Sequence, residues 1–306
     1  MTFGAAFLHH PDLFPARLSG DAWGTAPLRL EIAGFPFVLS GLSAGQAARA
    51  NEHYRDLLLP LPAGADDSRV AIFRAPEADF RSFDLAGWQT TFDFDYGADA
   101  VRWAGRRTMA RLELGGERRS ALWTPAGDSD PEFLGILENT LRVVVAYRCL
   151  AAGGALLHSA GINADGRAWL FVGPSGAGKS TLCGLSQRAG HRVLSDELNA
   201  LFLVDGEPRL AQLPFAGDFG GVALERASFP LAGILLLRQG PAAALDPVDS
   251  GRAIGALVAA CPFVNGDARR LDRLLDNLES LGRATPVRRL TFRLDPDFWR
   301  ILLAAP

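Results

Sequence analysis

The chain has 306 residues, of which 48% are hydrophobic and 21% charged, and its formal net charge is −3. This length is enough for a substantial core in one large or two modest domains. The mixed, slightly acidic charge excludes the basic surface typical of nucleic-acid-binding proteins. The N-terminus has no signal-peptide pattern and no apolar run reaches membrane-spanning length, so we expect a cytoplasmic protein that binds neither nucleic acid nor membrane.

Cysteine usage agrees with a reducing compartment. The three cysteines are far apart, have no metal-ligand spacing and are odd in number: Cys149, Cys183 and Cys261. This argues against a disulfide framework, and we expect each to pack as a small apolar residue. The pair His9–His10 has no third ligand in register, and we interpret it as surface.

Residues 1–130 are predicted to form a β-rich N-terminal region. An apolar stretch at residues 28–39 is broken by Gly-Phe-Pro, which predicts a hairpin, and residues 44–59 have the composition of a helix. Further short strands, separated by Gly and Asp turns, are predicted at residues 70–74, 88–94, 100–103 and 108–114. Such a region can hold an extended peptide along an exposed strand edge.

Residues 131–306 are predicted to form a second domain. Ser129 or Asp130 is positioned to cap a helix with Pro131 at its first position, ending near Gly154. Alternating strand and helix patterns follow, which indicates an α/β core. We expect strands at 155–162, 167–172, 192–195, 198–204, 232–237 and 287–294, and helices at 181–189, 269–281 and 298–303.

A glycine-rich loop carries the clearest chemical signal. Residues 173–180 read GPSGAGKS, a complete match to G-x-x-x-x-G-K-[ST] between an apolar strand and a helix. Its backbone amides can curl toward phosphate oxygens, and the helix adds its positive N-terminal end. We therefore expect nucleotide phosphates to bind Gly173, Pro174, Ser175, Gly176, Ala177, Gly178, Lys179, Ser180 and Thr181.

Lysine usage points to the same loop. Of the 31 Lys and Arg residues, Lys179 alone is a lysine. A compact ammonium fits inside a ring of backbone amides where a guanidinium does not. In such loops the lysine reaches the β- and γ-phosphates and the following hydroxyl, here Ser180, binds Mg²⁺. The expected cofactors are ATP and Mg²⁺.

Three neighbours narrow the chemistry. His158 lies on the predicted strand at 155–162, adjacent to the strand that leads into the loop, although a lone histidine more often has a structural role. Asp196 and Glu197 follow the strand at 192–195, whose carboxyl end would lie beside the loop. Carboxylates there can bind Mg²⁺ or accept a proton, whereas the alternative is a solvated turn. At residues 190–192 (GHR) we expect a simple helix stop.

Residues 155–200 resemble the catalytic domain of HPr kinase/phosphorylases and their smaller bacterial relatives. The matching elements are the strand with His158, the loop GPSGAGKS and the segment GHRVLSDE, in which Glu197 replaces the family's second Asp. Residues 230–238 and 287–299 look similar to the HPr-kinase-like peptide serine kinases of bacterial peptide-modification clusters. The resemblance implies a phosphoenolpyruvate-carboxykinase-like P-loop core that transfers the ATP γ-phosphate to a hydroxyl.

The resemblance also implies roles. His158, Lys179, Asp196 and Glu197 would be catalytic, and Ser180, Asp196 and Glu197 would hold the metal, with either carboxylate as the general base. HPr kinases assemble as oligomers, so a homo-oligomer is compatible with the resemblance. Residues 212–222 lack the signature associated with HPr docking and phosphorolysis, so HPr is not the expected acceptor.

We expect an ATP-dependent kinase acting on a serine or threonine hydroxyl of a peptide or small protein. The alternatives are a kinase of the same fold acting on free serine or a sugar, and a non-catalytic ATP-binding regulator. The loop at residues 217–221 can close over substrate or be a surface turn. Arg238, after an apolar strand, is a further candidate cation for the transition state.

Overall fold

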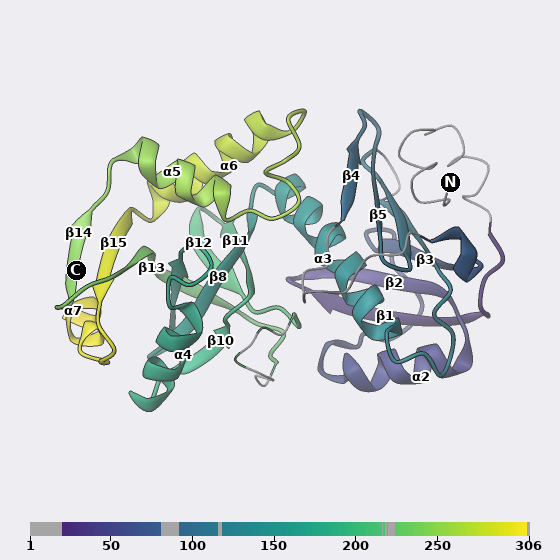
Figure 1. Ribbon diagram of the computed structural model, residues 1–306, viewed down its shortest axis with the longest axis horizontal. Helices are drawn as coiled ribbons and strands as arrows, with labels where there is room; N and C mark the ends of the chain where they lie inside the picture. The colour runs from purple at the N-terminus through teal and green to yellow at the C-terminus, as the bar shows by residue number, and fades with distance from the viewer. Residues whose placement is uncertain are drawn as a thin grey trace. The chain divides into compact units, whose positions relative to one another are not determined.

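The computed structural model describes residues 20–80, 92–115, 118–215, 217, 219 and 224–304. The chain is a mixed α/β protein that divides into two compact units, Met1–Val144 and Val145–Pro306 (Figure 1). This division falls inside helix α3 (Phe133–Ala151), whereas the sequence analysis placed the boundary before it. Within the described ranges, no helix is long and apolar enough to cross a membrane.

The first unit is built on a seven-stranded mixed sheet, in the order β1-β2-β3-β7-β6-β5-β4. Strand β3 runs parallel to both of its neighbours, and the remaining pairs are antiparallel. The strands are β1 (Ala26–Ile32), β2 (Phe35–Leu42), β3 (Ser68–Arg74), β4 (Asp93–Tyr96), β5 (Ala100–Gly105), β6 (Thr108–Glu113) and β7 (Arg119–Thr124). The helical segments are α2 (Ala44–His53), η3 (Arg55–Leu57) and η4 (Glu77–Asp79).

Most local predictions for this unit are confirmed. The predicted hairpin is the β1–β2 pair, and its turn has positive φ at Ala33 and Gly34. The predicted helix at 44–59 is too long, because Leu58 is extended and forms a bridge with Leu30 at the edge of β1. The predicted strand at 88–94 lies mostly outside the described residues, as does the His9–His10 pair.

Helix α3 begins later than predicted. Asp130 acts as expected at its start, since its carboxylate accepts a hydrogen bond from the Glu132 amide at 2.9 Å. Pro131, however, lies in the turn before Phe133 and not in the helix. The carboxylate of Asp130 is also held by Arg107, and this contact lowers the pKa of Asp130 against the opposing effect of burial.

The second unit contains an eight-stranded mixed sheet that bends, because β8 and β13 each have three partners. Its strands are β8 (Ala155–Ala164), β9 (Arg167–Val172), β10 (Arg192–Ser195), β11 (Leu198–Val204), β12 (Glu207–Ala211), β13 (Ser228–Gln239), β14 (Ala244–Pro247) and β15 (Val287–Phe292). Its helices are α4 (Lys179–Arg188), α5 (Ser250–Ala259), α6 (Leu271–Ala284) and α7 (Phe298–Ala304), and Figure 1 shows α5 and α6 side by side.

Strand direction places several loops at one edge of this sheet. Strand β13 lies between β9 and β15 and runs parallel to both. Strand β10 runs in the same direction as β9, because both are antiparallel to β8. Across the sheet the order is therefore β10, β8, β9, β13, β15. The segments after β10, β9, β13 and β15 all emerge at the same edge, which is where α/β proteins commonly bind ligands.

A cluster of buried aromatic side chains connects the strands of this unit to α7 and α4. Phe171, Phe292, Phe298 and Trp299 are buried and contact one another, and Trp299 also donates its indole N–H to Ser186 on α4 at 3.1 Å. Packing of α7 therefore fixes α4 relative to the strands.

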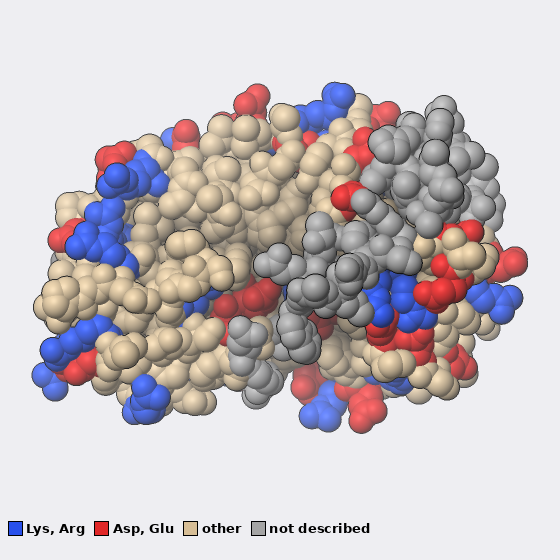
Figure 2. All heavy atoms as spheres, viewed as in Figure 1, with Lys and Arg blue, Asp and Glu red and all other residues tan. Residues whose placement is uncertain are grey.

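Cys149, Cys183 and Cys261 are buried and free, as predicted. On the face in Figure 2, basic and acidic side chains are interspersed.

Asn277 ties three elements of this unit together. Its amide donates to the carbonyls of Leu150, at the end of α3, and Gly154, before β8, at 2.9 and 3.0 Å. Asn277→Ala would leave both carbonyls without this donor in a buried setting, and we expect it to lower the free energy of unfolding by about 2 kcal/mol. Chemical denaturation measures this; the exposed Asp276→Ala is the control, and an equal effect of both would contradict the prediction.

Candidate functional site

The glycine-rich loop connects β9 to α4. Residues 174–176 are exposed, Gly176 and Gly178 have φ of 78° and 100°, and Gly178 precedes the first residue of the helix. The helix begins at Lys179 and not at residue 181 as predicted, because Gly178 already supplies its carbonyl to the Leu182 amide. The loop thus lies between a buried strand and a helix N-terminus, an arrangement that favours anions.

Lys179 is buried within this loop. Its ammonium donates to the carbonyls of Gly173 and Pro174, at 3.1 and 3.4 Å. An ammonium has three donors, so one remains for an anion held by the loop. Burial lowers the pKa of Lys179, and the carboxylates of Glu197 and Asp196 partly offset this. A phosphate group would add further compensating negative charge.

Ser180 and Asp196 meet directly at the sheet edge. The Ser180 hydroxyl donates to Asp196 Oδ2 at 3.0 Å, which brings together the loop and the segment after β10. Asp196 is 5% exposed, and the same oxygen accepts the Phe219 amide at 3.0 Å. A hydroxyl and a carboxylate side by side are the oxygen ligands that suit Mg²⁺, which needs only one or two carboxylates beside substrate phosphates.

Glu197 and His158 lie close to each other in the candidate site. His158 Nε2 lies 3.8 Å from Glu197 Oε2, and both side chains are partly exposed. Strand pairing explains the proximity, because His158 on β8 lies opposite Leu198 at the start of β11. The predicted residues His158, Lys179, Ser180, Asp196 and Glu197 therefore cluster along the edge.

Two residues hold the acidic pair in place: Ser195, which the sequence analysis did not single out, and Gly217, which it named only as part of the loop at 217–221. Ser195 accepts the amides of Glu197 and Leu198 with its hydroxyl, at 3.1 and 3.2 Å, and so forms the bend between β10 and β11. Gly217 lies so close to Asp196 that an added Cβ would be 2.3 Å from Asp196 Oδ1. The rest of the predicted loop at 217–221, apart from Phe219, lies outside the described residues.

Two other candidates from the sequence analysis are Arg238 and the turn at residues 190–192. Arg238 is exposed near the end of β13 and remains a candidate only by position. Gly190 ends α4 as predicted: its φ is 88°, its amide donates to Gln187 O, and the next amide, of His191, donates to Ser186 O. This is the hydrogen-bond pattern of a Schellman motif.

His191 gives the second unit a pH-dependent stability. Burial lowers the pKa of His191, with Asp165 partly opposing the shift, and its ring lies 4.2 Å from that of Trp299. The unfolded chain therefore binds the proton more readily, so folded stability is lost as pH falls below about 6.5. Thermal unfolding from pH 7 to 5 should show a steeper decline in wild type than in His191→Gln; equal slopes would contradict this.

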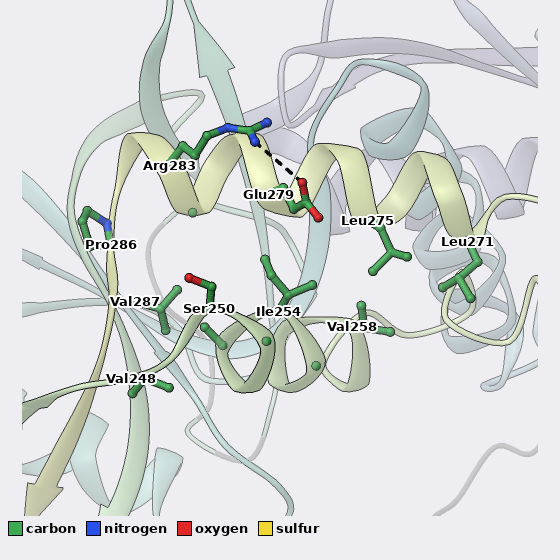
Figure 3. Close-up of a pocket in the computed structure, with 14 residues that line it drawn as sticks. Val248, Ser250, Ile254, Val258, Leu271, Leu275, Glu279, Arg283, Pro286 and Val287 are labelled. Carbon is green, nitrogen blue, oxygen red and sulfur yellow. Dashed lines mark ion pairs between the residues drawn. The ribbon is translucent and has the colours of Figure 1, made fainter.

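An apolar groove lies elsewhere in this unit. The groove, of about 710 Å³, runs between α5 and α6, where Ile254 and Val258 face Leu275, and Glu279 pairs with Arg283 at 3.6 Å on one wall (Figure 3). None of the predicted site residues lines it. The predicted site residues therefore lie outside this groove, at the sheet edge.

Comparison with known proteins adds no assignment, because no protein-family model and no curated protein matches the chain. In the described part of the chain, no group of three or more His, Cys, Asp or Glu side chains forms a metal site by itself. Of the predicted metal ligands, Ser180 and Asp196 contact each other, and Glu197 follows Asp196 in the chain.

Proposed function

We propose that the protein is an ATP-dependent kinase that transfers the γ-phosphate to a serine or threonine hydroxyl of a peptide or small protein. The observation that carries this proposal is the hydrogen bond between Ser180 and Asp196. It joins a loop suited to phosphate with the acidic pair Asp196–Glu197, and a site that only stored nucleotide would not need two carboxylates there. The sequence resemblance to HPr-kinase-like enzymes, and with it a phosphoenolpyruvate-carboxykinase-like P-loop core, supports the same reading.

The geometry separates the roles of the two carboxylates. Asp196 is buried beside Ser180 and is the better metal ligand, whereas Glu197 is more exposed and lies near His158. We therefore assign Mg²⁺ binding to Ser180 and Asp196, and proton acceptance to Glu197. Mg²⁺ would supply neutralisation of the charge on the transferred phosphate.

The chain's own groups account for the remaining steps. Lys179 and the loop amides hold the phosphates, which positions the γ-phosphorus for in-line attack. The acceptor oxygen forms the new bond to phosphorus as the bond to the β-phosphate oxygen breaks, and ADP leaves. The hydroxyl proton passes to Glu197, and His158 orients that carboxylate.

The acceptor class follows from the resemblance and from the strand content of the first unit. Regions rich in strands can hold an extended peptide by strand addition. A kinase for free serine or a sugar remains the alternative, since the same catalytic groups would serve it.

The test offers the full-length protein γ-labelled ATP with a serine- and threonine-containing peptide pool, free serine or a sugar panel. We expect a peptide to gain one phosphate on a hydroxyl in the presence of Mg²⁺, and none when the cation is chelated. Mass spectrometry locates the phosphate. Transfer to free serine or a sugar alone would favour the small-molecule kinase, and ATP binding without any transfer would favour the regulator.

A further inference from the structure

A second opening lies directly beside the glycine-rich loop, and we call it the flank pocket. Its volume is about 450 Å³, within the usual range of small-molecule pockets, roughly 300–1,000 Å³. The loop, α4 and the ends of β13 and β15 form its walls through Gly178, Thr181, Gln239, Gly240, Phe292, Arg293 and Leu294. Neither Asp196 nor Glu197 lines it.

The flank pocket and the acidic pair lie on opposite sides of the loop. Along the sheet edge the acidic pair follows β10, the loop follows β9, and the pocket is built at the ends of β13 and β15. The helix repeats this separation, since Ser180 contacts Asp196 whereas the adjacent Thr181 lines the pocket. Consecutive helical residues point in directions about 100° apart. A phosphate chain whose terminal group reaches Asp196 would therefore have its other end at the flank pocket.

The lining of the flank pocket suits a flat group with a polar rim. Leu294 is 82% exposed, which is unusual for a large apolar side chain, and it stands at the pocket wall. The Phe292 ring lies beneath, so close to Gly178 that a Cβ there would be 2.9 Å from its Cζ. Gln239 donates to Gly176 O at 3.2 Å, and its amide has a further donor and an acceptor to offer.

Charge argues against a longer phosphate chain in this pocket. Its cation, Arg293, donates to the carboxylates of Asp295 and Asp297 at 3.2 and 2.9 Å. These two carboxylates offset the guanidinium charge, so the pocket offers little attraction to an additional anion. A neutral ligand group fits the lining better.

We propose that the flank pocket holds the nucleoside of the phosphate donor. Leu294 covers one face of the base and the Gln239 amide pairs with a polar edge, which makes both residues specificity-determining. The site therefore selects a nucleoside triphosphate over a bare phosphate chain. This inference rests on the proposed function of the loop.

The experiment measures binding of Mg²⁺-ATP and of Mg²⁺-tripolyphosphate, which lacks a nucleoside, to the full-length protein by calorimetry. We expect wild type to bind ATP at least about tenfold more tightly, since an apolar contact discriminates by about 10–200-fold. Leu294→Ala should weaken ATP binding by about tenfold and leave tripolyphosphate binding unchanged. The control Leu303→Ala, an exposed residue of α7 outside the pocket, should change neither.

Two results would overturn the inference while leaving the loop's role intact. One is equal affinity of wild type for ATP and tripolyphosphate. The other is an equal effect of Leu294→Ala on both ligands, including no effect. If neither ligand binds wild type, the phosphate-binding role of the loop itself is wrong, and the nucleoside pocket with it.

Discussion

Asp196→Asn is expected to reduce phosphate transfer by about 10²–10³-fold, the range seen when a group that stabilises transition-state charge is removed. The substitution keeps the shape of the side chain and an oxygen that can accept the Ser180 hydroxyl and the Phe219 amide. The negative charge is lost, and with it the ligand that we assign to Mg²⁺. Initial rates with γ-labelled ATP across a range of Mg²⁺ concentrations measure the effect, and added cation should not restore the rate.

The control for this experiment is Asp205→Asn. Asp205 is exposed in the β11–β12 turn with φ of 52°, a conformation that asparagine tolerates well. We expect normal transfer and normal stability. If Asp196→Asn transferred phosphate as fast as wild type, Asp196 would be neither a metal ligand nor a proton acceptor in this protein.

Apolar runs bounded by turn residues carried the fold prediction in the second unit. The bounds of β9, β10 and β11 match the predicted strands, because each is a buried stretch that ends at Gly, Asp or Glu. The short strand β12 was missed: it begins Glu-Pro-Arg and pairs with β11 through a turn with positive φ at Asp205 and Gly206. Its strand conformation comes from its partners, not from its composition.

Helix α5 was missed for a related reason. It contains Gly251 and Gly255, which lower intrinsic helix propensity, while the Asp249 cap to the Arg252 amide at 2.9 Å is a weak signal in isolation. Packing against α6 stabilises it in the folded chain. This packing against α6 joins segments that are apart in the chain, so a short stretch of sequence does not predict it.

For the candidate site, the sequence predicted the residues to which we assign chemistry, and the structure brings them together. The loop and the segment after β10 were readable because motif spacing and strand direction together imply a shared edge. Ser195 carries no motif, and Gly217 was named only as part of a loop that can close over substrate or be a surface turn. Gly217 matters only because the folded chain brings it against Asp196, and a contact across that sequence distance has no local signature.

Gly217→Ala is expected to slow phosphate transfer by about 10²-fold, the cost of displacing a catalytic group by about 1 Å. The new methyl group would lie 2.3 Å from Asp196 Oδ1 and 2.9 Å from the Cβ of Glu197, so one of the two segments must move. Movement of the carboxylate would lengthen its bond to Ser180, and movement of the loop would remove the Phe219 amide. Initial rates measure the loss.

The metal dependence separates this variant from Asp196→Asn. Gly217→Ala retains the carboxylate charge, so a higher Mg²⁺ concentration should restore part of its rate by drawing Asp196 back toward the cation. The matched control is Gly255→Ala in α5, where a Cβ meets nothing within 4 Å. It should transfer phosphate normally and gain roughly 0.5–1 kcal/mol of stability from the better helix former. A Gly217→Ala protein with the wild-type rate would mean that the position of Asp196 does not limit the reaction.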